Sequence, residues 1–238
     1  MIALENLTVR FGGIVALDAV TAQVSAPVSG IIGPNGAGKT TTMNVISGFL
    51  TSSGSVTVDG VDLMQMPPHL RTRWGLRRSF QREQIADDLT VAENLWAIAD
   101  NLAGSRATKR ADIETALEFV GITAIAGKPG ARLNTFERRL CDLARCVTGN
   151  PRLIMLDEPA GGLTVEETAR LGDLITAIPD LGRAQVLVID HDVDLISRIC
   201  RETLVLDFGR RIAFGPTSVV LADPAVKAAY LGIEADHA

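Results

Sequence analysis

The chain has 238 residues, the length of one large domain or of a domain with an inserted subdomain. With 47% hydrophobic and 21% charged residues it has the composition of a globular protein with enough apolar material for a core. The net charge of −5 gives no electrostatic support for a nucleic-acid partner, and no apolar run reaches the roughly 18–20 residues that span a bilayer.

The first residues and the cysteines bear on the compartment. The chain does not begin with a basic segment followed by an apolar one, so we expect no secretion signal. Cys141, Cys146 and Cys200 are odd in number and lack metal-type spacing. The odd number and the spacing of the cysteines favour reduced thiols in a cytoplasm. We expect Cys141 and Cys146 to pack on a helix.

The first two predicted elements are strands. Loosely alternating apolar residues over 2–11 and 14–24 indicate two strands joined by a turn at Gly12 and Gly13. Phe11 comes directly before that turn. An exposed ring there could stack on a purine base, and packing in the core is an equally good interpretation of this residue taken alone.

A phosphate-binding motif comes next. The pattern G-x-x-x-x-G-K-T at 33–40 follows a buried-strand run at 28–32 and precedes a predicted helix at 41–49. Its glycines let backbone N–H groups turn inward around phosphates, Lys39 brings charge to the terminal phosphates, and the Thr40 hydroxyl can ligate Mg²⁺. The motif with these flanks predicts binding of ATP or GTP. The predicted nucleotide-binding residues here are Gly33, Pro34, Asn35, Gly36, Ala37, Gly38, Lys39, Thr40 and Thr41.

Two strands and a short helix follow this motif. Residues 54–60 predict a strand that ends in a turn, and the Pro67–Pro68 pair opens a short helix. Residues 77–81 predict a strand that brings Gln81 into a loop. An amide at the end of a strand could position a water molecule or complete a Mg²⁺ shell, although one glutamine proves neither.

The pattern becomes helical from 82 to 150. Apolar residues recur at helical spacing from Thr90, over 112–120 and after Asn134. Asn134 can cap the last of these helices, with Glu137 completing a capping box. We interpret the block as a helical subdomain inserted into an α/β core.

Two further buried strands end in polar residues. The apolar run at 152–156 leads into Asp157 and Glu158, and the run at 185–189 leads through an aspartate into His191. Ligand chemistry in parallel sheets gathers at the carboxyl ends of strands, where the phosphate motif also lies. Asp157 can then hold Mg²⁺ through its water shell, and Glu158 can orient or deprotonate a water that attacks the γ-phosphate. His191 would lie near that phosphate, although a structural histidine is about as good an interpretation.

The order of these motifs resembles the ATP-binding-cassette (ABC) ATPases over essentially the whole chain. Within that superfamily the sequence is similar to those of the ATPases of branched-chain amino-acid importers. Urea and lipopolysaccharide transport ATPases look similar too, so the solute is less well defined than the superfamily. LIMLDEP at 153–159 is one of the motifs that carry the superfamily resemblance. The segments that match the importer ATPases are RFGGIVALDAV at 10–20, RSFQ at 78–81, LTVAENL at 89–95 and DPAVKAAYLG at 223–232.

The resemblance implies a fold and a set of roles. The fold is α/β, a P-loop NTPase core of the ABC type with an antiparallel β subdomain and an inserted helical subdomain. It implies that Phe11 stacks on adenine and that Gln81 bridges Mg²⁺ and the transport domain. It also implies that Glu158 is the catalytic base, that His191 senses the γ-phosphate, and that 160–163 crosses to a partner subunit. The implied catalytic residues are Glu158, His191, Gln81 and Lys39, the implied metal residues are Thr40, Gln81 and Asp157, and the cofactors are ATP and Mg²⁺.

The signature segment departs from the family pattern. Members carry a sequence like LSGGQ, whereas this chain has Leu133, Asn134, Thr135, Phe136 and Glu137. Asn134 can still cap the helix, but a phenylalanine in place of the second glycine would block close approach to a partner's triphosphate. We therefore expect a weak or inactive site at Phe136 and a heterodimer with a different ATPase. In the alternative, the ring turns away and the helix end still serves.

We expect the core to comprise 1–81 and 151–238, with the helical subdomain at 82–150. The predicted function is ATP hydrolysis coupled to a separate permease at the cytoplasmic face of the membrane, with uptake of branched-chain amino acids or a similar small solute. The predicted partners are a second ATPase, permease subunits and, indirectly, a solute-binding protein. The altered signature supports a rival function, that of a regulatory nucleotide-binding module that drives no transport, and the intact Glu158 speaks against it.

Overall fold

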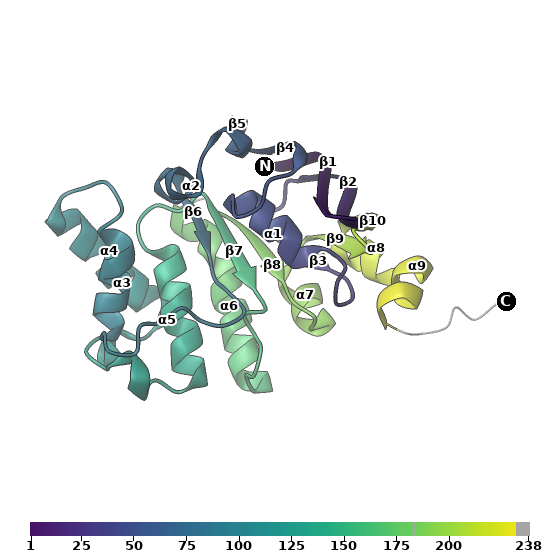
Figure 1. Ribbon diagram of the computed structural model, residues 1–238. Coiled ribbons are helices and arrows are strands. Elements are labelled where there is room, and N and C mark those ends of the chain that lie inside the picture. Colours follow the sequence, from purple (N-terminus) through teal and green to yellow (C-terminus); the bar gives the residue numbers. More distant parts are fainter. Residues whose placement is uncertain (183, 232–238) are drawn as a thin grey trace.

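Two sheets enclose the first helix in the computed structural model, which describes residues 1–182 and 184–231. The predicted α/β class with an antiparallel part and a helical part is confirmed (Figure 1). Gly232, the last residue of the matching segment at 223–232, lies outside the described residues.

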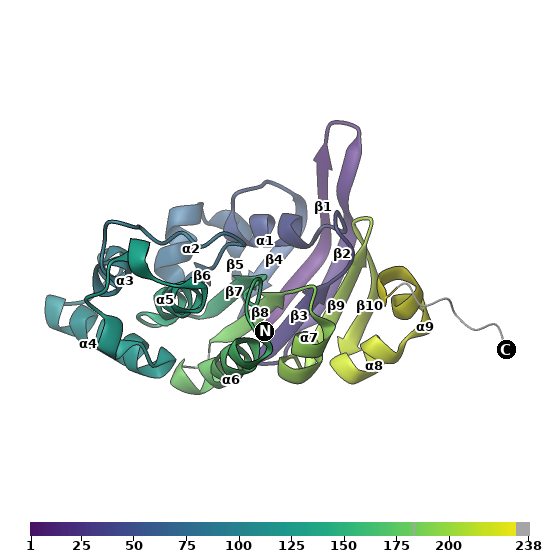
Figure 2. The same ribbon diagram turned by 90° about the horizontal axis from the view of Figure 1, so that it is seen from below.

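The first sheet is antiparallel and has the strand order β2-β1-β4-β5. Figure 2 shows that the hairpin of β1 and β2 extends beyond the rest of the molecule. Its strands are β1 (Ile2–Phe11), β2 (Ile14–Val24), β4 (Ser53–Val58) and β5 (Val61–Asp62).

The second sheet has the strand order β10-β9-β3-β8-β7-β6 and is parallel except for β10. Strands β3, β7 and β8 are buried along their whole length, as their continuous apolar sequences predict. The strands are β3 (Val28–Ile32), β6 (Leu76–Arg78), β7 (Leu153–Asp157), β8 (Gln185–Ile189), β9 (Glu202–Asp207) and β10 (Arg210–Pro216).

Helices α3, α4 and α5 form a separate group, which Figure 1 shows at one end of the molecule. The helices are α1 (Lys39–Ser47), α2 (Pro68–Trp74), α3 (Val91–Ala99), α4 (Arg106–Val120), α5 (Thr135–Val147), α6 (Val165–Gly182), α7 (Val193–Ile199), α8 (Thr217–Ala222) and α9 (Pro224–Val226). Short 3₁₀ turns are η1 (Leu63–Gln65), η2 (Thr123–Ile125) and η3 (Gly130–Arg132), and η4 (Lys227–Leu231) is a π-helical turn.

Some ends of elements differ from their predicted positions. Helix α1 ends at Ser47 because Gly48, with a φ of 81°, turns its N–H back to the carbonyls of the last turn. Helix α4 begins at Arg106 rather than 112, since the Ser105 hydroxyl accepts the N–H of Thr108 and caps it. Strand β6 ends at Arg78, so Gln81 lies in the loop beyond it rather than at its end.

The helical block shares a core with the second sheet. One apolar cluster joins α3, α4 and α5 to the buried strands and to α6 and α7, while a second cluster joins α1 to both sheets. Cys141 and Cys146 are buried on α5, as predicted, and their thiols are free. In the described part of the chain, every helix is too short or too polar to cross a membrane.

Candidate nucleotide-binding site

The phosphate loop lies between β3 and α1, as the motif predicts. The buried Lys39 ammonium donates hydrogen bonds to the carbonyl oxygens of Gly33 at 2.6 Å and Pro34 at 3.0 Å. Burial lowers the pKa of Lys39, while the charges of Glu158 and Asp157 act in the opposite direction. The ammonium therefore interacts electrostatically with both carboxylates.

Two glycines of this loop are required by the fold. Gly33 has a φ of 151°, and a Cβ built there would lie 2.1 Å from the carbonyl oxygen of Leu206. Gly38 has a φ of 103°, and its Cβ would lie 2.8 Å from the carbonyl oxygen of Ala16. A side chain at either position would meet backbone, which cannot yield as a flexible side chain can.

Three of the predicted catalytic side chains meet above neighbouring strands. The Gln81 Nε2 group donates to Glu158 Oε2 at 2.9 Å, and His191 Nδ1 lies 3.9 Å from the same oxygen. The strand order β8-β7-β6 brings them together, because Gln81 follows β6, Glu158 follows β7 and His191 follows β8. With Lys39 near Glu158, the four form one group.

Glu158 has an unusual backbone. Its φ is 49°, in the left-handed region that non-glycine residues seldom adopt, and its N–H donates to the carbonyl of Ile189 at 2.7 Å. Such backbone strain is common at functional sites, where the surrounding structure holds it. It sets the direction of the Glu158 side chain apart from that of Asp157.

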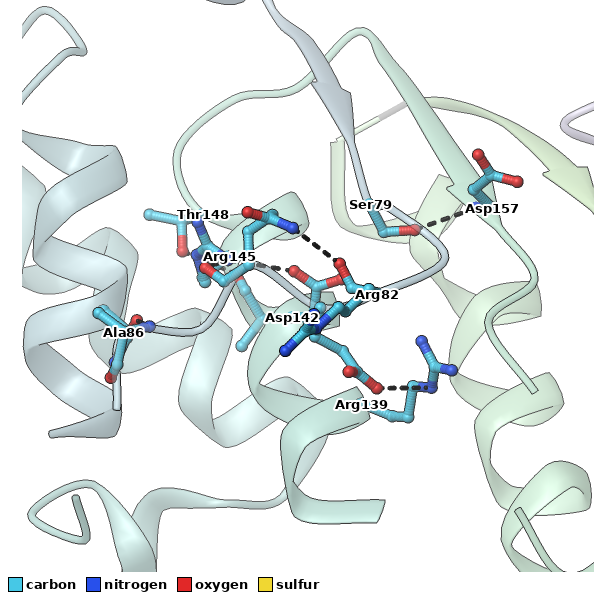
Figure 3. A network of polar contacts seen from close by, with 12 residues as sticks. Ser79, Arg82, Ala86, Arg139, Asp142, Arg145, Thr148 and Asp157 are labelled. Carbon is cyan, nitrogen blue, oxygen red and sulfur yellow. Dashed lines mark hydrogen bonds and ion pairs between the residues drawn. The ribbon is translucent and has the colours of Figure 1, made fainter. Parts of the chain in front are cut away.

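Asp157 ends β7 as a buried carboxylate, and the sequence did not indicate its partner. Arg78 Nη2 lies 3.3 Å from Asp157 Oδ2. The Asp157 N–H donates to the Ser79 hydroxyl at 3.0 Å, as Figure 3 shows. Burial raises the pKa of Asp157, whereas Arg78 and Lys39 counteract that rise and Glu158 adds to it. Only the position of Arg78 in a strand beside β7 could have indicated this ion pair.

Asp190 is a second site residue to which the sequence analysis gave no role. Its buried carboxylate accepts the N–H of Asp192 at 3.0 Å and that of Ala160 at 3.4 Å. Burial raises its pKa, and these hydrogen bonds and His191 oppose the rise. The side chain thus ties the loop after β7 to the loop after β8, and His191 Nδ1 lies 3.6 Å from Asp190 Oδ1.

The segment after Gln81 is held by α5, as Figure 3 shows. Arg139 pairs with Glu83 at 3.0 Å and donates to the Gly161 carbonyl at 3.1 Å, beyond Glu158. Arg145 pairs with Asp142 at 3.2 Å and donates to the carbonyl of Gln84 at 2.7 Å. The helix that begins with the altered signature is thereby connected to the loops that carry Gln81 and Glu158.

The signature segment is capped as predicted. Asn134 Oδ1 accepts the Glu137 N–H at 2.8 Å, and Glu137 Oε2 accepts the Asn134 N–H at 2.9 Å. The Phe136 ring is partly buried against the core, with the Arg170 guanidinium 5.4 Å from its centroid. This placement fits the alternative in which the ring turns aside, and the activity of a site built on this segment stays a prediction.

Phe11 is the last residue of β1, which with β2 forms the projecting hairpin of Figure 2. Its side chain is half exposed, with a relative accessibility of 50%. The ring is therefore available for stacking, and its role as the adenine platform stays a prediction.

The chain matches the family model described as ABC transporter over residues 20–161. It is 34% identical to the high-affinity branched-chain amino acid transport ATP-binding protein BraF of Pseudomonas aeruginosa, with 98% of each chain covered. This chain belongs to the ABC transporter family. As an ABC ATPase it is homologous to the ATP-hydrolysing subunits of transporters.

Other similarities agree with this family. The chain is 32% identical to the lipopolysaccharide export system ATP-binding protein LptB of Haemophilus influenzae, over 96% of this chain and 95% of that one. A crystal structure of the ADP conformation of an ABC transporter cassette has 27% identity and a TM-score of 0.87, over 98% of this chain and 99% of that one. This ABC ATPase thus resembles subunits of an amino-acid transporter and of an export system.

The donor atoms at the site suit Mg²⁺ held together with a nucleotide. Carboxylate, hydroxyl and amide oxygens are hard ligands, which Asp157, the exposed Thr40 and Gln81 supply. In the described ranges, 1–182 and 184–231, no three His, Cys, Asp or Glu side chains gather into a group that could hold an ion. Such a donor set fits an ion that takes much of its shell from phosphate and water.

Proposed function

We propose that this ABC ATPase binds Mg²⁺ and ATP between the phosphate loop and the carboxylates that follow β7, and that it couples hydrolysis to a separate permease. We place it at the cytoplasmic face of the membrane, where the permease would hold it. The observation that carries the proposal is the convergence of Lys39, at the start of α1, with Gln81, Glu158 and His191 in the loops that follow β6, β7 and β8.

Each residue of the group has a chemical task in this proposal. The Lys39 ammonium neutralises phosphate charge, and Mg²⁺ supplies further charge neutralisation when it is bound. Glu158 accepts a proton from the attacking water or orients it, because its carboxylate is the one at this group that Gln81 contacts. His191 lies near the same carboxylate oxygen and would contact the γ-phosphate.

We propose uptake of branched-chain amino acids, or of a similar small solute, as the transport process. The similarity to BraF over 98% of both chains supports this solute class, while the similarity to LptB shows that a related cassette serves export. Because the permease selects the solute, the test is identification of the chains that copurify with this subunit from native membranes. Copurification of the permease subunits of an importer would support the proposal, and copurification of the permease subunits of an exporter would contradict it.

ABC ATPase subunits of transporters dimerise and partner with membrane permeases. We propose that this subunit pairs with a non-identical ATPase, since Asn134 and Phe136 replace the serine and second glycine of the usual signature. Its own phosphate loop, Asp157 and Glu158 are complete, so it hydrolyses ATP when a partner supplies a regular signature. The Phe136 ring packed under Arg170 is the observation that favours the alternative, a competent site in a homodimer.

ATPase assays of the lone subunit and of a coexpressed pair separate these cases. The proposal predicts low turnover alone, strong turnover in the pair and a gain for the lone Phe136→Gly variant. The Glu158→Gln variant is the control for residual activity. Strong turnover of the lone subunit, unchanged by Phe136→Gly, would contradict the heterodimer. A pair that binds ATP but never hydrolyses it would favour the regulatory module.

The permease contact is proposed for a groove of about 380 Å³ between the core and the helical block. Its lining includes the apolar side chains Phe49, Phe80 and Ile98 together with His69 and Arg145. Phe49 is 56% exposed and stacks on Phe80 with the ring centroids 6.3 Å apart. An amphipathic helical segment of the permease that carries an acidic residue would match this apolar lining and its basic side chains.

Copurification with the permease tests this contact. Phe49→Asp would place a charge among the apolar groups of the groove and should abolish copurification. Val219→Asp is the matched control, because Val219 is 65% exposed and lies on α8, away from the groove. Equal retention of the permease by both variants would show that the groove is not the contact.

A further inference from the structure

We propose that Arg78 is a positioning residue, which fixes the orientation of Asp157 at the magnesium site. The inference rests on the proposed function in one respect, the role of Asp157 toward Mg²⁺. It adds a residue of β6 that pairs with that carboxylate and also contacts helix α1.

The contacts of Arg78 join three elements. One amino group, Nη2, lies 3.3 Å from Asp157 Oδ2 at the end of β7. The other, Nη1, donates to Asn44 Oδ1 at 2.7 Å and to the Ser47 hydroxyl at 3.1 Å, both on α1. Helix α1 begins at Lys39, so one guanidinium connects the helix of the phosphate loop to the carboxylate opposite it.

The plane of the guanidinium is also held. Its central carbon lies 4.8 Å from the Phe80 ring centroid and 5.8 Å from that of Phe49, and the arginine side chain is only 6% exposed. A planar group fixed by two rings and three polar partners leaves its ion-pair partner little freedom. Lysine carries the same charge but has no fork, so it cannot make these contacts together.

The neighbouring arginine shows what a purely structural role looks like. Arg77 is buried and donates to the backbone carbonyls of Thr72 at 2.7 Å and Leu76 at 3.1 Å. Successive residues of a strand point to opposite faces, so Arg77 is directed away from Asp157. It is a matched control in the same strand with the same side chain.

The experiment measures the gain in nucleotide affinity that Mg²⁺ confers. Binding of a non-hydrolysable ATP analogue to the full chain is measured by calorimetry in Mg²⁺ and in EDTA, and the ratio of the two affinities is the magnesium gain. Residues that orient a metal ligand typically contribute about ten-fold or more to metal affinity. We expect Arg78→Lys to reduce the magnesium gain about ten-fold and to leave the affinity in EDTA within about two-fold of the wild type.

Two further variants keep the result interpretable. Asn44→Ala removes the anchor of Arg78 without touching Asp157 and should reduce the magnesium gain in the same direction, by less. Arg77→Lys should lower the melting temperature and leave the gain unchanged. An unchanged gain in Arg78→Lys and Asn44→Ala, or an equal loss of affinity in Mg²⁺ and EDTA, overturns the role of Arg78. A wild type that binds no nucleotide in either condition overturns the proposed function itself.

Discussion

Asp142 offers a quantitative test of the packing between α5 and the segment after Gln81. The pKa of Asp142 is raised from 3.8 to about 6, chiefly by burial and also by the charge of Glu83. The positive charges of Arg145 and Arg139 act in the opposite direction and do not cancel the effect of burial. The folded state therefore binds the Asp142 proton more tightly than the unfolded state does.

The sign of the effect follows from linkage. Below pH 3.8 both states hold the proton, and the stabilisation is fully present; it is lost as the pH rises through about 6. A pKa change of this size corresponds to about 3 kcal/mol in total. Part of that is already lost at pH 4.5, so about 2 kcal/mol remains to be lost between pH 4.5 and pH 7.

The Asp142→Asn variant isolates this contribution, because an amide does not titrate and Arg145 keeps the carbonyl of Gln84 as a partner. Urea unfolding of both proteins between pH 4.5 and pH 7 gives the difference in the free energy of unfolding. We expect this difference to move by about 2 kcal/mol in favour of the variant as the pH rises. A difference that is constant over this range would refute the assignment of a buried carboxylate with a raised pKa to Asp142.

Three further outcomes are expected. Gly33→Ala should cost at least about 2 kcal/mol of stability in thermal unfolding, whereas Gly13→Ala, with nothing within 4 Å of its Cβ, should be neutral; similar costs would contradict the backbone clash. Asn134→Ala should lose about 1 kcal/mol of unfolding free energy with the cap of α5, and no loss would show that Glu137 alone suffices. Phe11→Ala should weaken ATP and GTP binding alike, by about 1 kcal/mol or more in calorimetry; unchanged affinities would leave Phe11 a surface residue.

Features set by local sequence were predictable here. The buried strands β7 and β8, the glycine turn of the phosphate loop and the capping box of Asn134 and Glu137 each depend on residues close together in the chain. The convergence of Gln81 and Glu158 also followed, because parallel strands present their carboxyl ends at one edge.

Features set by tertiary contacts were not predictable. The partners of Arg78 come from α1 and β7, and those of Arg139 come from the loops after β6 and β7. The Phe136 ring contacts Arg170, which lies on another helix distant in sequence. The division at residues 81 and 150 stays a prediction, although the helical block packs into the same apolar cluster as the second sheet.

Calorimetric titration of the full chain with Mg·ATP tests the central claim most directly, with Lys39→Ala and Glu158→Gln beside the wild type. In the proposed mechanism Lys39 makes charge-assisted contacts to the phosphates, so its loss should weaken binding by more than about ten-fold. Glu158→Gln should bind as the wild type does, because the proposal assigns that carboxylate to the attacking water and not to the nucleotide. A wild type that gives no binding signal, or a Lys39→Ala variant that binds equally well, would contradict the nucleotide site described above.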